Sequence, residues 1–257
     1  MDQNEETLRY IREEVLPTPF CPGCGHGILM GAIARALESS EVDMSKMLFV
    51  SGIGCAAWIP SPHFAADTMH VTHGRAIAFA TGAKLAKPEL TVMVISGDGD
   101  LAAIGGNHLI HAARRDIEMI VICANNEVYG MTGGQVSPTT PFGDTTATTP
   151  RGNREHPFNL CKLAEAAGAS YVARFTVLHV RQLIKSIKTA LTVKGFSFIE
   201  VISPCPTEYG RRNSLRSPAS LLEKLKENYV GEGLLVGAGE AEAMGKIIVG
   251  EFVKKQP

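Results

Sequence analysis

Short runs of β-branched and apolar residues alternate along this chain with longer segments of helical period. The strand-like runs lie at 48–50, 91–96, 118–124, 171–175 and 196–202. The helix-like segments lie at 76–86, 105–115, 159–167 and 178–193. Such alternation is typical of a mostly parallel central sheet with helices on both faces. The sequence therefore predicts an α/β fold.

Two regions stand apart from this alternation. Residues 127–157 form a long stretch rich in Thr, Gly and Pro. Loops of that length are uncommon in compact domains unless they are functional, so we expect this one to fold over a site. Ser217 and Pro218 precede an apolar segment and predict a helix start. We expect one domain over residues 1–215 and a C-terminal helical extension and tail over residues 216–257.

Composition excludes several classes of protein. The chain has 257 residues, of which 45% are hydrophobic and 20% charged, enough to form a core without disulfides. Its formal net charge of -1 gives no reason to expect nucleic acid or an anionic membrane as a partner. No apolar run approaches the length of about 20 residues that spans a membrane, and residues 1–16 lack a signal pattern. We therefore expect a cytoplasmic protein.

Polar side chains follow two of the predicted strands. Gly97-Asp98-Gly99-Asp100 comes directly after one strand, and Asn125-Asn126 comes after the next, so Asp98 and Asn126 are about one strand–helix–strand unit apart. A right-handed crossover sets both at the carboxyl edge of neighbouring parallel strands, where open α/β sheets bind ligands. A carboxylate, an amide oxygen and the Val128 carbonyl are hard ligands that suit magnesium. The helix that begins at Gly105-Gly106 presents an amino end that favours anions.

Gly-Asp-Gly alone is also compatible with an ordinary turn. A Rossmann dinucleotide site competes poorly, since Ala102 stands where that fingerprint has glycine. Together with Asn125-Asn126, the spacing resembles the thiamine-diphosphate signature. That resemblance implies that Asp98, Asn126 and the Val128 carbonyl hold Mg²⁺ on the diphosphate.

Six cysteines in a reducing compartment are expected to be ligands, redox groups or buried thiols. Cys21 and Cys24 form a Cys-x-x-Cys loop, which is ambiguous among redox, zinc and iron–sulfur chemistry. Cys55 and Cys205 lie in Gly- or Pro-rich settings whose free amides suit cluster sulfurs. The four cysteines suit either zinc or a [4Fe–4S] cluster, and their spacing does not decide between the two. The other two, Cys123 and Cys161, are expected to be core thiols.

These motifs together resemble the β subunit of 2-oxoacid:ferredoxin oxidoreductases. The matching segments run in a fixed order: 20–27, 52–55, 73–76, 97–100, 125–135 and 204–206. The resemblance implies the thiamine-diphosphate-binding fold and a [4Fe–4S] cluster on Cys21, Cys24, Cys55 and Cys205. It implies a cofactor site built from these residues: Gly54, Cys55, His73, Gly74, Gly97, Asp98, Gly99, Asp100, Asn126, Val128, Gly130, Met131 and Thr132. His73 is the catalytic candidate, and a histidine packed in the core is the alternative.

The family implies oxidative decarboxylation of a 2-oxoacid by coenzyme A, with electrons passing to ferredoxin. An α subunit, with γ and δ subunits as further candidates, is the implied partner, because no carboxylate here has an evident claim to activate the aminopyrimidine. The segments 58–64, 148–150 and 210–213 look like the 2-oxoglutarate branch. Four arginines could bind a second substrate carboxylate: Arg151, Arg154, Arg211 and Arg212.

Other functions remain open at this stage. Within the family, branched-chain 2-oxoacids or pyruvate are alternative substrates. A non-redox thiamine enzyme half with a four-cysteine zinc site is a different enzyme class. A non-enzymatic zinc scaffold is a third interpretation, and it leaves the Asp98 and Asn126 pair unexplained.

Overall fold

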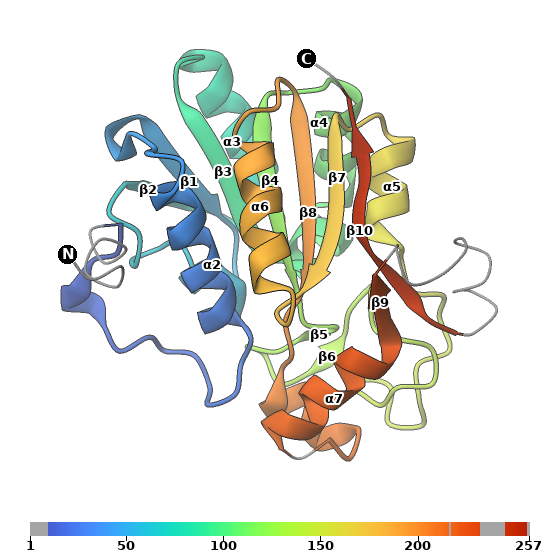
Figure 1. Ribbon diagram of the computed structural model, residues 1–257. Coiled ribbons are helices and arrows are strands. Elements are labelled where there is room, and N and C mark those ends of the chain that lie inside the picture. Colours follow the sequence, from blue (N-terminus) through green and yellow to red (C-terminus); the bar gives the residue numbers. More distant parts are fainter. Residues whose placement is uncertain (1–9, 216, 232–244, 256–257) are drawn as a thin grey trace.

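The computed structural model describes residues 10–215, 217–231 and 245–255, and an eight-stranded sheet lies at its centre (Figure 1). In spatial order its strands are β2 (Asp67–His70), β1 (Met47–Ser51), β3 (Thr91–Gly97), β4 (Met119–Asn125), β8 (Phe196–Ile202), β7 (Tyr171–Thr176), β10 (Ile247–Lys254) and β9 (Tyr229–Gly231). The first six are mutually parallel, and β10 is antiparallel to β7. The predicted mostly parallel α/β sheet is confirmed.

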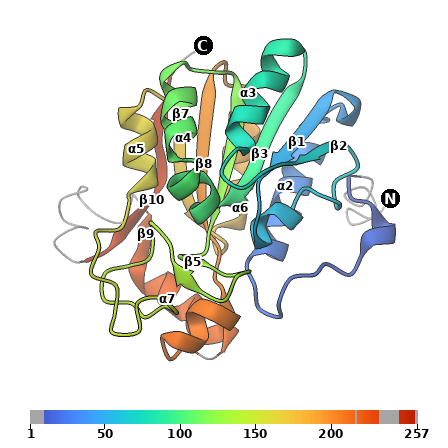
Figure 2. The ribbon, with the colours of Figure 1, turned by 180° about the vertical axis from the view of Figure 1, so that it is seen from behind.

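Helices cover both faces of this sheet. Their bounds are α2 (His26–Glu38), α3 (Ala76–Ala86), α4 (Gly106–Arg114), α5 (Leu160–Ala166), α6 (Val180–Ala190) and α7 (Pro218–Asn228). Figure 1 shows α2 and α6 on one face, and Figure 2 shows α3, α4 and α5 on the other. Each face has its own apolar core, one around Phe49 and Ile95 and one around Val94 and Val121. Successive residues of β3 contribute to opposite cores because side chains alternate across a strand.

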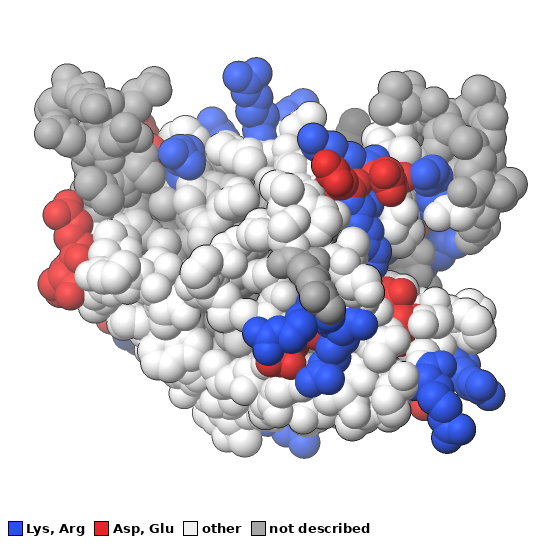
Figure 3. Space-filling view, turned by 90° about the horizontal axis from the view of Figure 1, so that it is seen from below, with Lys and Arg blue, Asp and Glu red and all other residues white. Residues whose placement is uncertain are grey.

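The carboxyl ends of the parallel strands meet at one edge, the lower edge in Figure 1. The long loop 127–157 lies here with a small hairpin, β5 (Val128–Tyr129) and β6 (Gln135–Val136). Helix α7 lies at the same edge, and Ser217 caps its first turn as predicted. Figure 3 looks onto this edge and shows Lys and Arg side chains gathered within a largely uncharged surface. The loop predicted to fold over a site lies at this edge.

The C-terminal region differs from the predicted helical extension and tail. After α7 the chain forms β9 and then β10, which joins the main sheet beside β7. Strand β10 begins with the β-branched residues Ile247-Ile248-Val249, a strand signal that the prediction of a helical extension did not take into account. Part of the region, namely residues 216, 232–244 and 256–257, lies outside the described chain, as do residues 1–9. The division into two domains at residue 215 remains a prediction.

A π-helical turn and strand β2 are among the elements that were not predicted. The helix expected to begin at Gly105 is preceded by a π-helical turn, Gly99–Ile104, so helical structure starts directly after Asp98. Strand β2 was missed because it is short and half-exposed, without an apolar run. In the described residues, no helix is long and apolar enough to cross a membrane.

Candidate functional site

The carboxyl ends of β1, β3 and β4 line a cavity that is open to solvent, and its empty space, solvent included, is about 470 Å³. Its walls are Ile53, Gly54, Cys55, Ala56, His73, Gly97, Asp98, Gly99, Asp100, Asn126, Val128, Tyr129, Gly130, Met131 and Thr132. Every residue predicted to bind the cofactor is therefore in this cavity except Gly74. Gly74 lies behind the wall, where a side chain would overlap Ile104.

The Asp100 carboxylate organises one wall of the cavity. It is 2% exposed, and its Oδ1 accepts hydrogen bonds from the backbone amides of Ile53 at 3.1 Å and Gly74 at 2.7 Å. Ser96 Oγ donates to Oδ2 at 2.9 Å. Through these hydrogen bonds, Asp100 connects segments at the carboxyl ends of three different strands. Gly52 is required here, because a Cβ would lie 2.2 Å from this carboxylate.

His73 lines the cavity and is not a core histidine. Its side chain is 31% exposed, and its Nδ1 lies 2.5 Å from Asp100 Oδ1. Because a carboxylate only accepts, Nδ1 carries the proton, and Nε2 is left as the ring nitrogen for a ligand. Tyr129 lies edge-on to the imidazole and donates to the Gly99 carbonyl.

The predicted magnesium ligands lie together in the same cavity. Asp98 is 1% exposed, and its Oδ1 accepts from the Asn126 amide at 3.4 Å. Burial raises the pKa of Asp98, and hydrogen bonds from Ser137, Thr139 and the Asn126 backbone oppose that rise. Asn126 Oδ1 accepts from the Val128 amide, which fixes the turn after β4. A carboxylate, an amide oxygen and a backbone carbonyl are a donor set that fits Mg²⁺.

The four predicted ligand cysteines come from three distant segments and converge beside this cavity. A Cβ on Gly130 would lie 3.7 Å from the sulfurs of both Cys55 and Cys205. Thr207 Oγ1 lies 3.8 Å from the Cys21 sulfur and 3.7 Å from the Cys205 sulfur. Cys55 therefore belongs to the cavity wall and to the cysteine group at once.

Packing of the Cys-x-x-Cys loop explains this convergence. Gly25 donates its amide to the Pro204 carbonyl, and a Cβ there would overlap Ser203. Burial raises the pKa of Cys24 to about 12, and the other three cysteines of the group add to the rise through their charges. The six cysteines form no disulfide. Among the described residues, no three His, Cys, Asp or Glu side chains converge closely enough to hold a single metal ion.

The remaining two cysteines lie in the core, as predicted. Cys123 is 0% exposed within β4, and Cys161 is 3% exposed on α5. Burial raises the pKa of both thiols well above the usual value.

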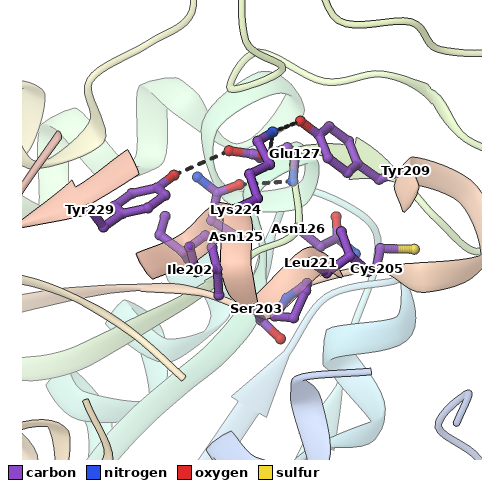
Figure 4. Close-up of a pocket in the computed structure, with 12 residues that line it drawn as sticks. Asn125, Asn126, Glu127, Ile202, Ser203, Cys205, Tyr209, Leu221, Lys224 and Tyr229 are labelled. Carbon is purple, nitrogen blue, oxygen red and sulfur yellow. Dashed lines mark hydrogen bonds and ion pairs between the residues drawn. The ribbon is translucent and has the colours of Figure 1, made fainter. Parts of the chain in front are cut away.

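A second cavity, of about 310 Å³, lies on the other side of the Asn125-Asn126 turn and is closed by α7 (Figure 4). Lys224 points from α7 toward Glu127 and Tyr209 in this view. Its Nζ lies 3.7 Å from Glu127 Oε2 and 3.3 Å from Asp144 Oδ2, and it donates to the Tyr209 hydroxyl. Ion pairs with Lys224 therefore connect two parts of the long loop, at Glu127 and Asp144, to α7.

The four arginines considered for a substrate carboxylate all lie outside the cavity that His73 and Asp98 line. Arg151, Arg154 and Arg211 are exposed. Arg212 is also exposed, but its guanidinium donates to the Gly133 carbonyl and pairs with Glu208. Of the four arginines, Arg212 therefore contacts the segment that follows Thr132, a residue of the cavity wall.

Several residues of the site were missed by sequence reasoning. Thr139, Asp144 and Lys224 had no local signal, since their partners are tens of residues away. Arg174 and Glu200 did have a local signal, because each is the one charged residue in a mostly apolar strand.

Comparison with known proteins agrees with this geometry. Residues 52–201 match the family model described as thiamine pyrophosphate enzyme, C-terminal TPP binding domain. The 2-oxoglutarate synthase subunit KorB of Methanocaldococcus jannaschii is 52% identical over 246 residues, which cover 96% of this chain and 91% of that protein. A 2-oxoacid:ferredoxin oxidoreductase subunit beta from Sulfolobus sp is 44% identical over 191 residues, 73% of this chain and 62% of that protein.

A solved structure is similar over nearly the whole chain. It is the 2-oxoglutarate:ferredoxin oxidoreductase from Magnetococcus marinus with 2-oxoglutarate, coenzyme A and succinyl-CoA bound. The TM-score is 0.87 at 32% sequence identity, and the match covers 99% of this chain and 87% of that one. The chain therefore belongs to the family of 2-oxoacid:ferredoxin oxidoreductase β subunits and contains a thiamine pyrophosphate-binding domain.

Proposed function

We propose that this chain is the β subunit of a 2-oxoglutarate synthase, which converts 2-oxoglutarate and coenzyme A to succinyl-CoA and carbon dioxide. One observation carries the proposal: the cofactor cavity and the four-cysteine group share a wall. Cys55 lines the cavity, and a Cβ at Gly130, another residue of its wall, would lie 3.7 Å from the sulfurs of both Cys55 and Cys205. This oxidoreductase reaction needs a decarboxylation site that lies beside an electron-accepting group.

Asp98, Asn126 and the Val128 carbonyl are the residues that would hold Mg²⁺ against the diphosphate of thiamine diphosphate. Bound thiamine diphosphate supplies the electron sink that decarboxylation of a 2-oxoacid requires. Gly97 and Gly130 leave the backbone accessible, Gly99 makes room for the Tyr129 ring, and Met131 and Thr132 line the same wall. The buried Asp100 carboxylate lies 2.5 Å from His73 Nδ1, so we assign it the role of positioning His73.

His73 is the catalytic candidate of this chain. The buried Asp100 carboxylate holds the proton on Nδ1, which leaves Nε2 of this cavity-lining residue as the atom that accepts or donates a proton. The aminopyrimidine-activating carboxylate would come from an α subunit, and γ and δ subunits are further candidate partners.

Cys21, Cys24, Cys55 and Cys205 would hold a [4Fe–4S] cluster. Four thiolates suit either zinc or a [4Fe–4S] cluster. The shared wall with the cofactor cavity favours the cluster, because a cluster beside thiamine diphosphate would give electrons an exit. Bound there, the cluster takes up single electrons, and ferredoxin is the proposed acceptor. Thiolate ligation of this kind supports a reducing cytoplasmic location.

The experiment is reconstitution of the purified chain with its α-type subunit, thiamine diphosphate and Mg²⁺. Viologen reduction is then measured with 2-oxoglutarate, pyruvate and a branched-chain 2-oxoacid, each with and without coenzyme A. The expected result is coenzyme A-dependent reduction that is fastest with 2-oxoglutarate. Faster turnover of another 2-oxoacid would correct the substrate, and turnover of none of them would contradict the proposed function.

A further inference from the structure

Two opposite charges are buried in the middle of the sheet, on neighbouring strands. Arg174 of β7 and Glu200 of β8 are register partners, and Arg174 Nε donates to Glu200 Oε2 at 2.7 Å. Their side chains are 7% and 3% exposed. A buried pair of this kind adds little stability compared with apolar residues of similar volume. Stability alone therefore does not account for the pair.

Glu200 also fixes the orientation of Asn125, the first residue of the Asn-Asn turn. Asn125 Nδ2 donates to Glu200 Oε1 at 2.8 Å. Since a carboxylate can only accept, the amide nitrogen must face Glu200 and the amide oxygen must face away from it. That oxygen accepts from the Glu127 amide at 3.0 Å and lies 2.9 Å from Thr139 Oγ1.

Thr139 of the long loop lies between Asn125 and Asp98. Its Oγ1 is 2.6 Å from Asp98 Oδ2, shorter than its distance to Asn125. A hydroxyl has one proton, and a carboxylate is the stronger acceptor, so Thr139 donates to Asp98. Asp98, Asn125 and Thr139 are 1%, 3% and 6% exposed, so water cannot readily replace these bonds.

We propose that Thr139 is a positioning residue for Asp98, and that Ser137 holds Thr139 in place, because its hydroxyl lies 3.0 Å from Thr139 Oγ1 and accepts from the Thr139 backbone amide. The inference rests on the proposed role of Asp98 as a magnesium ligand. A carboxylate that is fixed by a hydrogen bond on one oxygen presents its remaining lone pairs in one direction. Partners of this kind govern metal affinity without touching the metal, and their loss typically costs about 10- to 100-fold in affinity.

The test uses the intact complex, stripped of metal and thiamine diphosphate and then titrated with Mg²⁺ at saturating thiamine diphosphate. Titration with Mn²⁺, followed by its electron paramagnetic resonance signal, gives a second readout that does not depend on turnover. Thr139→Val keeps the shape of the side chain and removes the hydroxyl. The expected result is that its apparent Kd for both metals rises about 10- to 100-fold, while Thr139→Ser stays near wild type.

Thr145→Val is the matched control, because Thr145 lies in the same loop and binds Asn213 through its backbone. Circular dichroism establishes that each variant is folded. If Thr139→Val does not fold, Thr139→Ala and Thr139→Ser test the same hydroxyl without the added methyl group. Wild-type metal affinity in the folded variant that lacks the hydroxyl overturns the inference.

Asp98→Asn separates this inference from the proposed function. Weak metal binding by Asp98→Asn together with wild-type binding by Thr139→Val would refute only the positioning role. Wild-type metal binding by Asp98→Asn would refute the magnesium role of Asp98 itself.

Discussion

Replacing Arg174 with Met is expected to destabilise the chain strongly, because Glu200 would remain buried without a cation. Arg174 and Glu200 are 7% and 3% exposed, so solvent screens the pair little. Removal of one partner of such a pair costs about 3–5 kcal/mol. Arg174 also donates to Asn159 Oδ1 at 2.7 Å, but Asn159 keeps its capping bond to the Lys162 amide. The estimate therefore remains about 3–5 kcal/mol.

The assay is urea-induced unfolding of the full-length chain, followed by circular dichroism. The expected result is a lower midpoint with an unchanged slope, equivalent to about 3–5 kcal/mol. The double variant Arg174→Met with Glu200→Gln is the control, because it removes both charges, keeps the buried volume and retains an oxygen that accepts from Asn125. Its stability should return to within about 1–2 kcal/mol of wild type. A single variant that loses under about 1 kcal/mol, or a double variant as unstable as the single, would refute this account of the buried pair.

Three further predictions concern the two sites and α7. Cys205→Ser should lower bound iron and bleach the visible absorbance of the complex, whereas Cys123→Ala should leave iron unchanged; full iron in Cys205→Ser would remove that ligand. Asp98→Ala should lose thiamine diphosphate but keep its iron, as measured by cofactor and iron analysis; retained cofactor would contradict the role of Asp98. Lys224→Met should lower the unfolding free energy by about 2 kcal/mol, because two partly buried carboxylates lose their cation. Lys226 is exposed, and Lys226→Met should change the unfolding free energy by under about 0.5 kcal/mol. Equal effects of the two variants would show that the ion pairs of Lys224 add nothing to stability.

Much of the architecture could be predicted because it is encoded locally. The apolar runs at β3 and β4 and the helix between them are visible as periodicity, and parallel crossover geometry then places Asp98 near Asn126. Their predicted proximity is observed, since the Asn126 amide donates to Asp98. The grouping of Cys55 with Cys21 and Cys205 is different. It depends on how three loops pack; their Gly- and Pro-rich settings suggested the set, and the family resemblance implied it, but neither gives the packing.

The rest depends on contacts between segments far apart in the sequence. Thr139 is 41 positions from Asp98. It lies in a loop with several threonines, and no local pattern distinguishes it from the others, so its partner could not be identified. Strand β10 pairs with β7 about 80 residues earlier in the chain, and a short β-branched run does not reveal its partner. The charges at Arg174 and Glu200 were visible in apolar strands. Only the sheet order shows that they are register partners.

The long loop follows β4 directly, and this position explains why it reaches both sites. Its first residues, Asn126 and Val128, line the cofactor cavity, and Gly130 lies against the sulfurs of Cys55 and Cys205. Further along, Thr139 returns to Asp98, and Asp144 binds Lys224 of α7. A loop held at so many points has little freedom to open without disturbing both sites. The proposed magnesium ligands and the cysteine group are therefore joined through the contacts of this one loop.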